Sequence, residues 1–137
     1  MSYRVFISHG SADKWVALQI ERAIRADCGA ATFVDVYDVA KGDDIEARIF
    51  EELPKCRELV VLLTPWSVDR NWVWVEIGAA RALGLRIVAV LYQVPLDVIE
   101  REKGGSTFLR TKNIVEINEL PTYLEELNQR VIEARGS

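Results

Sequence analysis

Short apolar runs alternate with longer amphipathic segments along the whole chain. The runs are rich in β-branched and aromatic residues and are flanked by turn-forming residues, so each predicts a strand. The predicted strands are Tyr3–Ile7, Ala31–Val36, Glu58–Leu63, Arg86–Tyr92 and Ile114–Ile117. The third and fourth are apolar at almost every position, which is typical of strands covered on both faces. The short fifth strand is expected near an edge of the sheet.

The segments between the strands carry apolar residues at helical spacing. The predicted helices lie within Ala12–Cys28, Ile45–Cys56, Thr64–Leu83 and Leu120–Val131, and a weaker pattern over Val94–Lys103 allows one more short helix. Ser11 or Asp13 is placed to cap the first helix. Pro54 is expected to end or bend the second, and Gly84 to terminate the third.

This alternation of strands and helices predicts an α/β fold of the flavodoxin-like type, a three-layer sandwich with helices on both faces of a parallel sheet. The commonest order of five such strands is 2-1-3-4-5, which places the topological switch point between strands 1 and 3. Ligands of these folds bind there, beyond the carboxyl ends of the strands. The loops expected at that point are Ser8–Ser11 and Thr64–Ser67. Residues 1–137 are interpreted as one domain.

Glu76 interrupts the apolar face of the third predicted helix. At about 100° per residue, positions 72, 76, 79, 80 and 83 share one face, with 73 and 75 at its flanks and Trp74, Arg81 and Leu85 opposite. Burying an isolated carboxylate costs about several kcal/mol or more, so this side chain needs a partner or a cavity. Either Glu76 pairs with an arginine and only holds the fold together, or it belongs to a functional site.

Composition and charge exclude several classes of protein. The net charge is −4 and the lysines and arginines are scattered among acids, which argues against nucleic acid or an anionic membrane as a partner. Cys28 and Cys56 lack the spacing of a zinc site or a disulfide framework. The first strand begins at the amino terminus without a signal peptide, and no apolar run reaches the length of about 20 residues that a membrane helix needs. A cytoplasmic location is therefore expected.

Three segments of the chain resemble the bacterial type of the Toll/interleukin-1 receptor (TIR) domain family. They are FISHGSAD (Phe6–Asp13), DVYDVAKGDDI (Asp35–Ile45), which corresponds to the loop called BB in that family, and SVDRNWVWVE (Ser67–Glu76). They occur in the family's order and at the matching elements, so the resemblance extends over the whole chain and implies a single TIR domain at 1–137.

The resemblance implies one of two functions. Some TIR domains cleave NAD+ at the nicotinamide–ribose bond through a glutamate on the third helix, with a tryptophan four residues before it, and Trp72 and Glu76 reproduce that spacing. The expected products are nicotinamide and ADP-ribose or a cyclic isomer, in bacterial antiviral defence or effector signalling, with activity dependent on self-association or on other TIR domains. The alternative is a non-catalytic adaptor that assembles through the BB loop.

The residues expected at the site are assigned by their chemistry. Glu76 is the catalytic candidate, because a carboxylate stabilises the positive charge that develops on the ribose. Trp72, and after it Trp66, offer stacking surfaces for nicotinamide or adenine, although core packing is the ordinary role of such a ring. Ser8, His9, Gly10 and Ser11 form a small polar loop before a helix, which suits a pyrophosphate. Asp38 and Lys41 lie in the BB loop, which closes over the nucleotide in the enzymes. NAD+ is expected as substrate, with no cofactor and no metal.

Two other classes of protein with this fold, one enzyme and one receiver domain, fit less well. A nucleoside deoxyribosyltransferase also relies on a glutamate, but it needs a covalent nucleophile at the strand ends. A phospho-receiver domain needs clustered aspartates, whereas Ser8 and Thr64 follow the first and third strands here. The product isomer, the activating trigger and the role of Glu76 among ribose contact, charge stabilisation and water orientation stay open.

Overall fold

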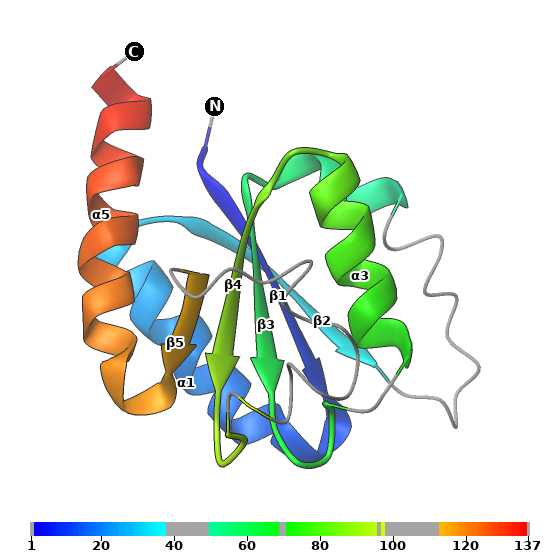
Figure 1. Cartoon of the computed structure of the whole chain (residues 1–137). Coiled ribbons are helices and arrows are strands. Elements are labelled where there is room, and N and C mark those ends of the chain that lie inside the picture. Colours follow the sequence, from blue (N-terminus) through cyan, green and yellow to red (C-terminus); the bar gives the residue numbers. More distant parts are fainter. Residues whose placement is uncertain (1, 38–49, 69–70, 96, 98–112, 137) are drawn as a thin grey trace.

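The computed structural model describes residues 2–37, 50–68, 71–95, 97 and 113–136. Its strands are β1 (Arg4–Gly10), β2 (Ala31–Tyr37), β3 (Glu58–Leu63), β4 (Arg86–Leu91) and β5 (Ile114–Glu116). Its α-helices are α1 (Lys14–Ala23), α3 (Asn71–Ala82) and α5 (Leu120–Gly136), and short 3-10 or π turns are η1 (Ser11–Asp13), η2 (Ile24–Cys28), η4 (Leu53–Lys55) and η7 (Ile117–Glu119) (Figure 1).

The five strands form one parallel sheet in the order β2-β1-β3-β4-β5, as the sequence predicts. β3 is buried at all six positions, which explains its continuous apolar run. β5 has three residues and forms one edge of the sheet, so that prediction is also confirmed. β1 pairs with β2 on one side and with β3 on the other, which places the switch point between β1 and β3.

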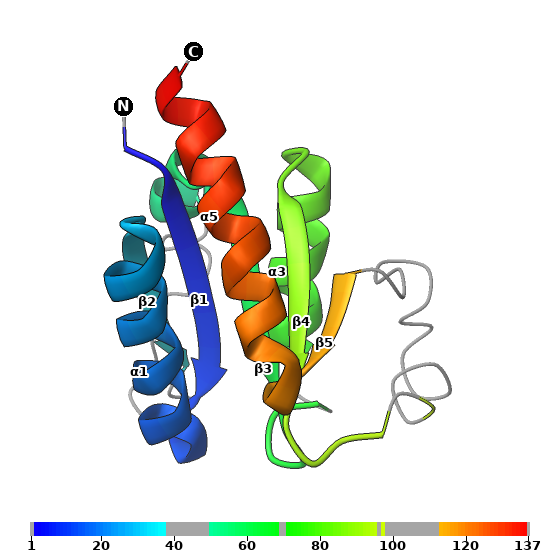
Figure 2. The same ribbon diagram turned by 90° about the vertical axis from the view of Figure 1, so that its left-hand side faces the viewer.

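Helices cover both faces of the sheet (Figure 2). α1 and α5 lie on one face, where they enclose Val5 and Ile7 of β1 together with Leu127. α3 lies on the other face, over Phe6 and Leu59. Successive residues of β1 therefore point to different layers, as the two-residue period of a strand requires.

The first helical segment is less regular than its sequence pattern predicts. A single helix over Ala12–Cys28 was expected, whereas the chain forms a 3-10 turn, then α1, then the π-helical turn η2. A π turn holds one residue more than an α turn, and here it keeps both Ile24 and Cys28 in the core. Gly29 then adopts a φ of 69°, the left-handed conformation that ends many helices.

Two further predicted helices fall partly outside the described residues. Of the segment 45–56, residues 50–52 are helical and continue into η4, where Pro54 occupies a 3-10 turn. Residues 45–49 lie outside the described part of the chain, as does most of 94–103. The expectation that Pro54 ends or bends the second helix agrees with the described portion.

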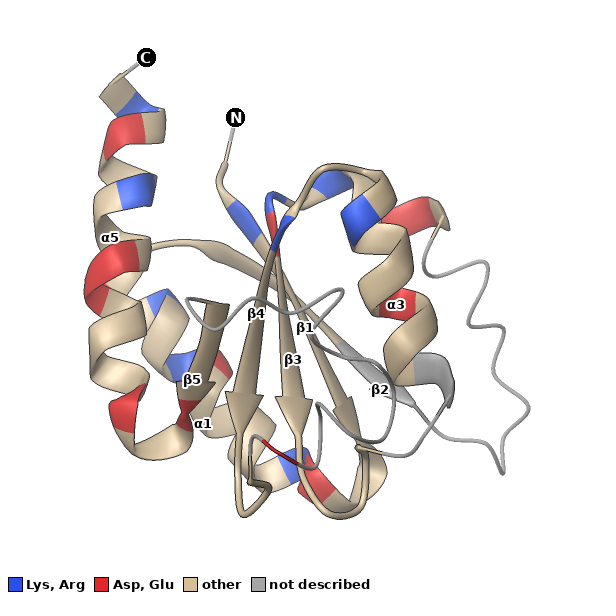
Figure 3. Cartoon of the chain, viewed as in Figure 1, with Lys and Arg blue, Asp and Glu red and all other residues tan. Residues whose placement is uncertain are grey.

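Charged residues lie on the helices and at the strand ends (Figure 3). Acidic and basic residues both occur along α5, and the middle parts of the strands show neither colour in their described residues. Most of these residues are exposed to solvent around an apolar sheet, whereas Asp13, Glu58 and Glu76 are buried. Among the helices that the structure describes, none is long and apolar enough to cross a membrane.

Candidate active site

The inward face of α3 is centred on Val73, Glu76, Ile77 and Ala80, all without exposed surface. The sequence pattern correctly predicts that Glu76 faces inward, but it places the centre of the buried helix face at other positions than the structure does. Leu83, expected on that face, is 48% exposed. The reason is that α3 is apolar on nearly all sides, so its periodicity fixes its rotation poorly.

A hydrogen bond joins Glu76 to the first strand. The hydroxyl of Ser8 donates to Oε1 of Glu76 at 2.7 Å, and both side chains are fully buried. Ser8 follows Phe6 on the face of β1 that α3 covers, and it pairs in register with Val61 of β3. The contact therefore lies against the carboxyl half of β1, in the layer between the sheet and α3.

The loops after β1 and β3 are tied together at the switch point. The hydroxyl of Thr64 donates to Oδ2 of Asp13 at 2.8 Å, and both residues are buried. Ser67 donates to the carbonyl of Leu62 and accepts from the backbone N–H of Thr64, each at 3.0 Å. These bonds fix the turn from which the chain leads toward α3.

Asp13 was expected as a possible helix cap, but it has another role. It occupies the N-cap position of α1 without a capping hydrogen bond, because its carboxylate accepts from Thr64 instead. Trp74, assigned by the sequence to the outer side of α3, is half-buried, and its indole N–H donates to the carbonyl of Val68 at 3.0 Å. Both side chains thus hold the turn that directly follows β3 in place.

The loop residues predicted to bind pyrophosphate take different positions. Gly10 is half-buried and Ser11 is exposed at the start of η1. His9 is fully buried, and the alternation of β1 places it on the side covered by α1 and α5, away from Glu76. Its Nδ1 lies 2.6 Å from the carbonyl of Gly10, and no described residue hydrogen-bonds its Nε2.

The remaining predicted site residues are only partly described. Trp66 is 56% exposed in the turn after β3, at the same edge of the sheet as Ser11. Trp72 belongs to α3, one turn before Glu76, but its side chain lies outside the described part of the structure. Asp38 and Lys41 also lie outside the described residues. Among these candidates, the structure thus brings Ser8 and Glu76 into direct contact.

Another buried carboxylate, that of Glu58, was not singled out by the sequence. It begins β3 and is fully buried against α5, where Arg130 donates from Nε to Oε2 at 2.6 Å and from Nη2 to Oε1 at 3.1 Å. Tyr123 donates to Oε1 at 3.0 Å, and Tyr3 donates to Oε2. Glu58 is therefore a buried glutamate paired with an arginine, an arrangement that stabilises the fold. The signal that could have identified Glu58 is an acid at the start of an otherwise apolar strand.

The electrostatics of this second cluster follow from its burial. Burial, together with the hydrogen bond and charge of Glu58, raises the pKa of Tyr3 to about 12. The same causes raise the pKa of Tyr123 well above its ordinary value. Burial opposes the charge of Arg130, but the hydrogen bonds to Glu58 outweigh it and hold the arginine pKa above its usual value. The cluster therefore keeps a charged arginine and two neutral phenols around Glu58.

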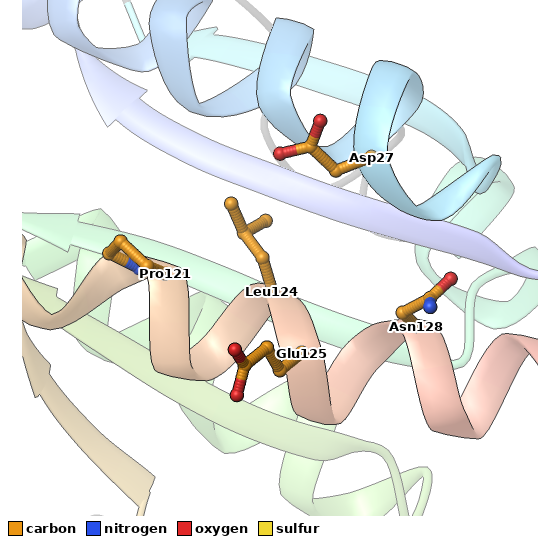
Figure 4. Close-up of a pocket in the computed structure, with 5 residues that line it drawn as sticks. All are labelled: Asp27, Pro121, Leu124, Glu125 and Asn128. Atoms are coloured by element: carbon orange, nitrogen blue, oxygen red, sulfur yellow. The ribbon is translucent and has the colours of Figure 1, made fainter.

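Two hollows formed by described residues lie away from Glu76, against α5. One has a volume of about 320 Å³ and lies between η2 and α5, where Asp27, Leu124, Glu125 and Asn128 line it together with Pro121 (Figure 4). A neighbouring hollow of about 380 Å³ is lined by Glu125, Glu126, Asn128 and Gln129. Carboxylates in both walls make them unsuitable for a pyrophosphate. Within the described residues, no group of three or more His, Cys, Asp or Glu side chains is placed to hold a metal ion.

Comparison with known families gives a match over nearly the whole chain. A family model described as TIR domain matches residues 5–130. A protein of Brucella abortus (strain 2308), described as probable 2' cyclic ADP-D-ribose synthase TcpB, is 29% identical over 103 residues. A Brucella melitensis biotype 1 protein with the same description has the same identity. The match covers 72% of this chain but 41% of each relative, so the chain spans less than half of their length.

Solved structures with the same fold are more distant in sequence. The TIR domain of the Toll-related receptor TRR-2 from Hydra magnipapillata has a TM-score of 0.58 at 17% identity, covering 96% of this chain and 98% of that domain. The sugar isomerase domain of an RpiR transcription factor from Sphaerobacter thermophilus has a TM-score of 0.63 at 11% identity, covering 96% and 73%. At these identities the likeness concerns the fold alone.

Proposed function

Because the chain belongs to the TIR domain family, we propose that it cleaves NAD+ at the bond between nicotinamide and ribose, with Glu76 as the catalytic carboxylate. The observation that carries the proposal is the placement of Glu76, which is fully buried in the middle of α3 and bonded to β1 close to the switch point. The description of the Brucella relatives as cyclic ADP-ribose synthases supports the same chemistry.

The reaction needs few groups from the protein. The bond from C1′ of the ribose to the nicotinamide nitrogen breaks, and its electron pair neutralises the pyridinium, so nicotinamide leaves without protonation. Positive charge develops on the ribose, and the negative carboxylate of Glu76 stabilises it. A water molecule that loses a proton to solvent then gives ADP-ribose. Attack by another group of the same molecule, with loss of a proton, gives a cyclic isomer.

Substrate access requires the site to open. Glu76 has no exposed surface in the single chain, so NAD+ reaches it only after a rearrangement of the groups around it. We link that rearrangement to self-association or to contact with other TIR domains, because closure and opening of loops commonly complete an active site. Trp72 and Trp66 are proposed to stack on the bases, and Ser11, Gly10, Asp38 and Lys41 to contact the remainder of the nucleotide. We place this activity in cytoplasmic defence or effector signalling.

Nicotinamide release from NAD+ tests the proposal. Wild-type protein and Glu76→Gln are compared over a range of protein concentrations, with and without a crowding agent. Glutamine keeps the shape and the acceptor for Ser8 but removes the charge, so we expect a folded protein with at least about 100-fold lower activity. Glu125→Gln, an exposed change on α5, is the matched control and is expected to retain full activity. Equal rates for wild type and Glu76→Gln would refute the catalytic role.

A further inference from the structure

Ser8 breaks the apolar pattern of β1 at the same place where Glu76 breaks that of α3. Phe6 precedes Ser8 on the face of β1 under α3, with Arg4 at the start of the strand and Gly10 at its end, and the neighbouring strand contributes Leu59 and Val61. A hydroxyl has no packing advantage in this layer, since it must be desolvated and then satisfied. Polar residues that interrupt two apolar faces and meet each other in space often mark a functional site.

We propose that Ser8 is a positioning residue, whose hydroxyl holds the catalytic carboxylate of Glu76 in one orientation. The proposal rests on the function proposed above. The hydroxyl lies 2.7 Å from Oε1, and both partners have no exposed surface. A hydrogen bond to a carboxylate favours the anion, which is the form that stabilises positive charge on the ribose.

The geometry gives Ser8 a different role from the one that its loop suggests. From the sequence, Ser8 was expected to contact the pyrophosphate together with Gly10 and Ser11. Ser11 is exposed at the surface, whereas the hydroxyl of Ser8 points into the layer between β1 and α3. A residue that binds substrate directly affects KM when it is removed, and one that orients the catalytic group affects kcat.

The backbone around Ser8 is suited to this task. β1 is an inner strand, paired with β2 and β3, and Ser8 is in register with Asp35 on one side and Val61 on the other. Glu76 reaches the hydroxyl from the middle of a helix whose inner face is packed by Val73 and Ile77. Two rigid elements therefore set the distance, which is the arrangement that keeps a catalytic group in place.

Steady-state kinetics of nicotinamide release separate the two roles. For Ser8→Ala we expect kcat to fall about 10- to 100-fold with KM changed less than about 2-fold, a tenfold change in rate corresponding to about 1.4 kcal/mol. Ser8→Thr keeps the hydroxyl and is expected to recover most of kcat, and Ser8→Cys, a weaker donor of similar shape, to fall between. Thr32→Val is the matched control, because it removes a 2.9 Å bond from a hydroxyl to the carboxylate of Glu21 far from the site.

Three kinetic outcomes overturn the inference. A rise in KM with kcat intact makes Ser8 a substrate ligand. An unchanged kcat and KM, with only a lower melting temperature, makes the bond purely structural. A loss of kcat that is as large in Ser8→Thr as in Ser8→Ala shows that the hydroxyl is not responsible.

Thermal unfolding supplies a readout that does not depend on activity. If the bond exists in solution, the loss of melting temperature in Ser8→Ala/Glu76→Ala differs from the sum of the losses in the single variants, because each alanine removes one partner of the bond. Additive losses would overturn the inference even in an inactive protein. Equal nicotinamide release by wild type and Glu76→Gln, together with non-additive unfolding, would instead refute the proposed function and leave a bond without a catalytic role.

Discussion

Arg130 binds both carboxylate oxygens of Glu58, from Nε at 2.6 Å and from Nη2 at 3.1 Å, across the interface between α5 and the start of β3. The same chain buries a second carboxylate, Glu76, whose Oε1 is bonded to a serine on the opposite face of the sheet. Glu58 is therefore held by an arginine, and Glu76 accepts a bond from a hydroxyl. The two acids differ in their partners, and the difference determines what each substitution does.

Loss of Arg130 is expected to destabilise the fold strongly. Arg130→Met leaves the charge of Glu58 buried without its cation, which typically costs about 3–5 kcal/mol of unfolding free energy. Adding Glu58→Gln removes that charge and keeps an acceptor for the tyrosines, so the double variant is expected to be more stable than Arg130→Met alone. Urea denaturation measures both. Arg135→Met, which removes an exposed bond to the carbonyl of Gly29, is the control and should cost less than about 1 kcal/mol.

Stability is expected to fall in alkaline solution because of the tyrosines around Glu58. The folded chain raises the pKa of Tyr3 from 10.0 to about 12, and that of Tyr123 also lies above its ordinary value. Below about pH 10 both states keep the phenolic proton. Between that value and about 12, the unfolded chain loses the proton while the folded chain holds it, so the free energy of unfolding decreases.

The measurement is the urea midpoint as a function of pH, followed together with phenolate absorbance. Tyr3→Phe/Tyr123→Phe is expected to be less stable at neutral pH, since two donors to Glu58 are lost, but to show a smaller alkaline decrease. A wild-type midpoint that stays constant across this range would contradict the expectation. So would native phenolate absorbance from all four tyrosines well below pH 12.

Both thiols are expected to resist alkylation in the folded protein. Burial raises the pKa of Cys56 to about 11 and that of Cys28 above its ordinary value. Each thiol also donates to a backbone carbonyl, Cys28 to Leu124 at 3.3 Å and Cys56 to Glu52 at 3.4 Å. Since the thiolate is the reactive species, iodoacetamide at about pH 8 should label them only as fast as the chain unfolds. Mass spectrometry with and without urea checks this, and rapid native labelling of either thiol would disprove it.

Replacing either of two glycines, Gly78 or Gly84, by alanine is expected to change the stability of the fold, but in opposite directions. Gly78 lies within α3, where an added Cβ would meet no atom within 4 Å, so Gly78→Ala should stabilise the fold by about 0.5–1 kcal/mol. Gly84 has a φ of 76°, so Gly84→Ala should cost about 1 kcal/mol although its surroundings are equally open. Melting temperatures of the two variants provide the test, and a shift in the same direction for both would contradict it.

The strands were predictable because each is marked by its own apolar run. Their order was predictable because an alternation of strands and helices allows only a few parallel sheets. The uninterrupted apolar run Glu58–Leu63 marks a central strand, and the alternation of strand and helix restricts the sheet to a few orders. Glu76 was likewise visible as an acid within an apolar face. The π turn at Ile24–Cys28 was not predictable, because one extra residue in a turn barely changes the helical period.

The contacts of the site depend on positions that are distant in the sequence. Ser8 and Glu76 are 68 residues apart, and nothing local to β1 indicates which residue of α3 its hydroxyl meets. The rotation of α3 was set by packing around Val73 and Ile77, since a helix that is apolar on most sides has several nearly equivalent faces. The pairing of Glu58 with Arg130 on α5 was missed as well, because the two residues are 72 positions apart in the sequence.

Ser8 and His9 are neighbours in β1, yet the pleat sends them to different layers of the molecule. The register of this strand thus encodes which functional group faces which helix. Inserting or deleting one residue upstream of Ser8 would exchange them, bringing an imidazole toward α3 and a hydroxyl toward α1 and α5, along with every apolar side chain that slips with them. β1 should accordingly tolerate changes of residue type more readily than any change in its length.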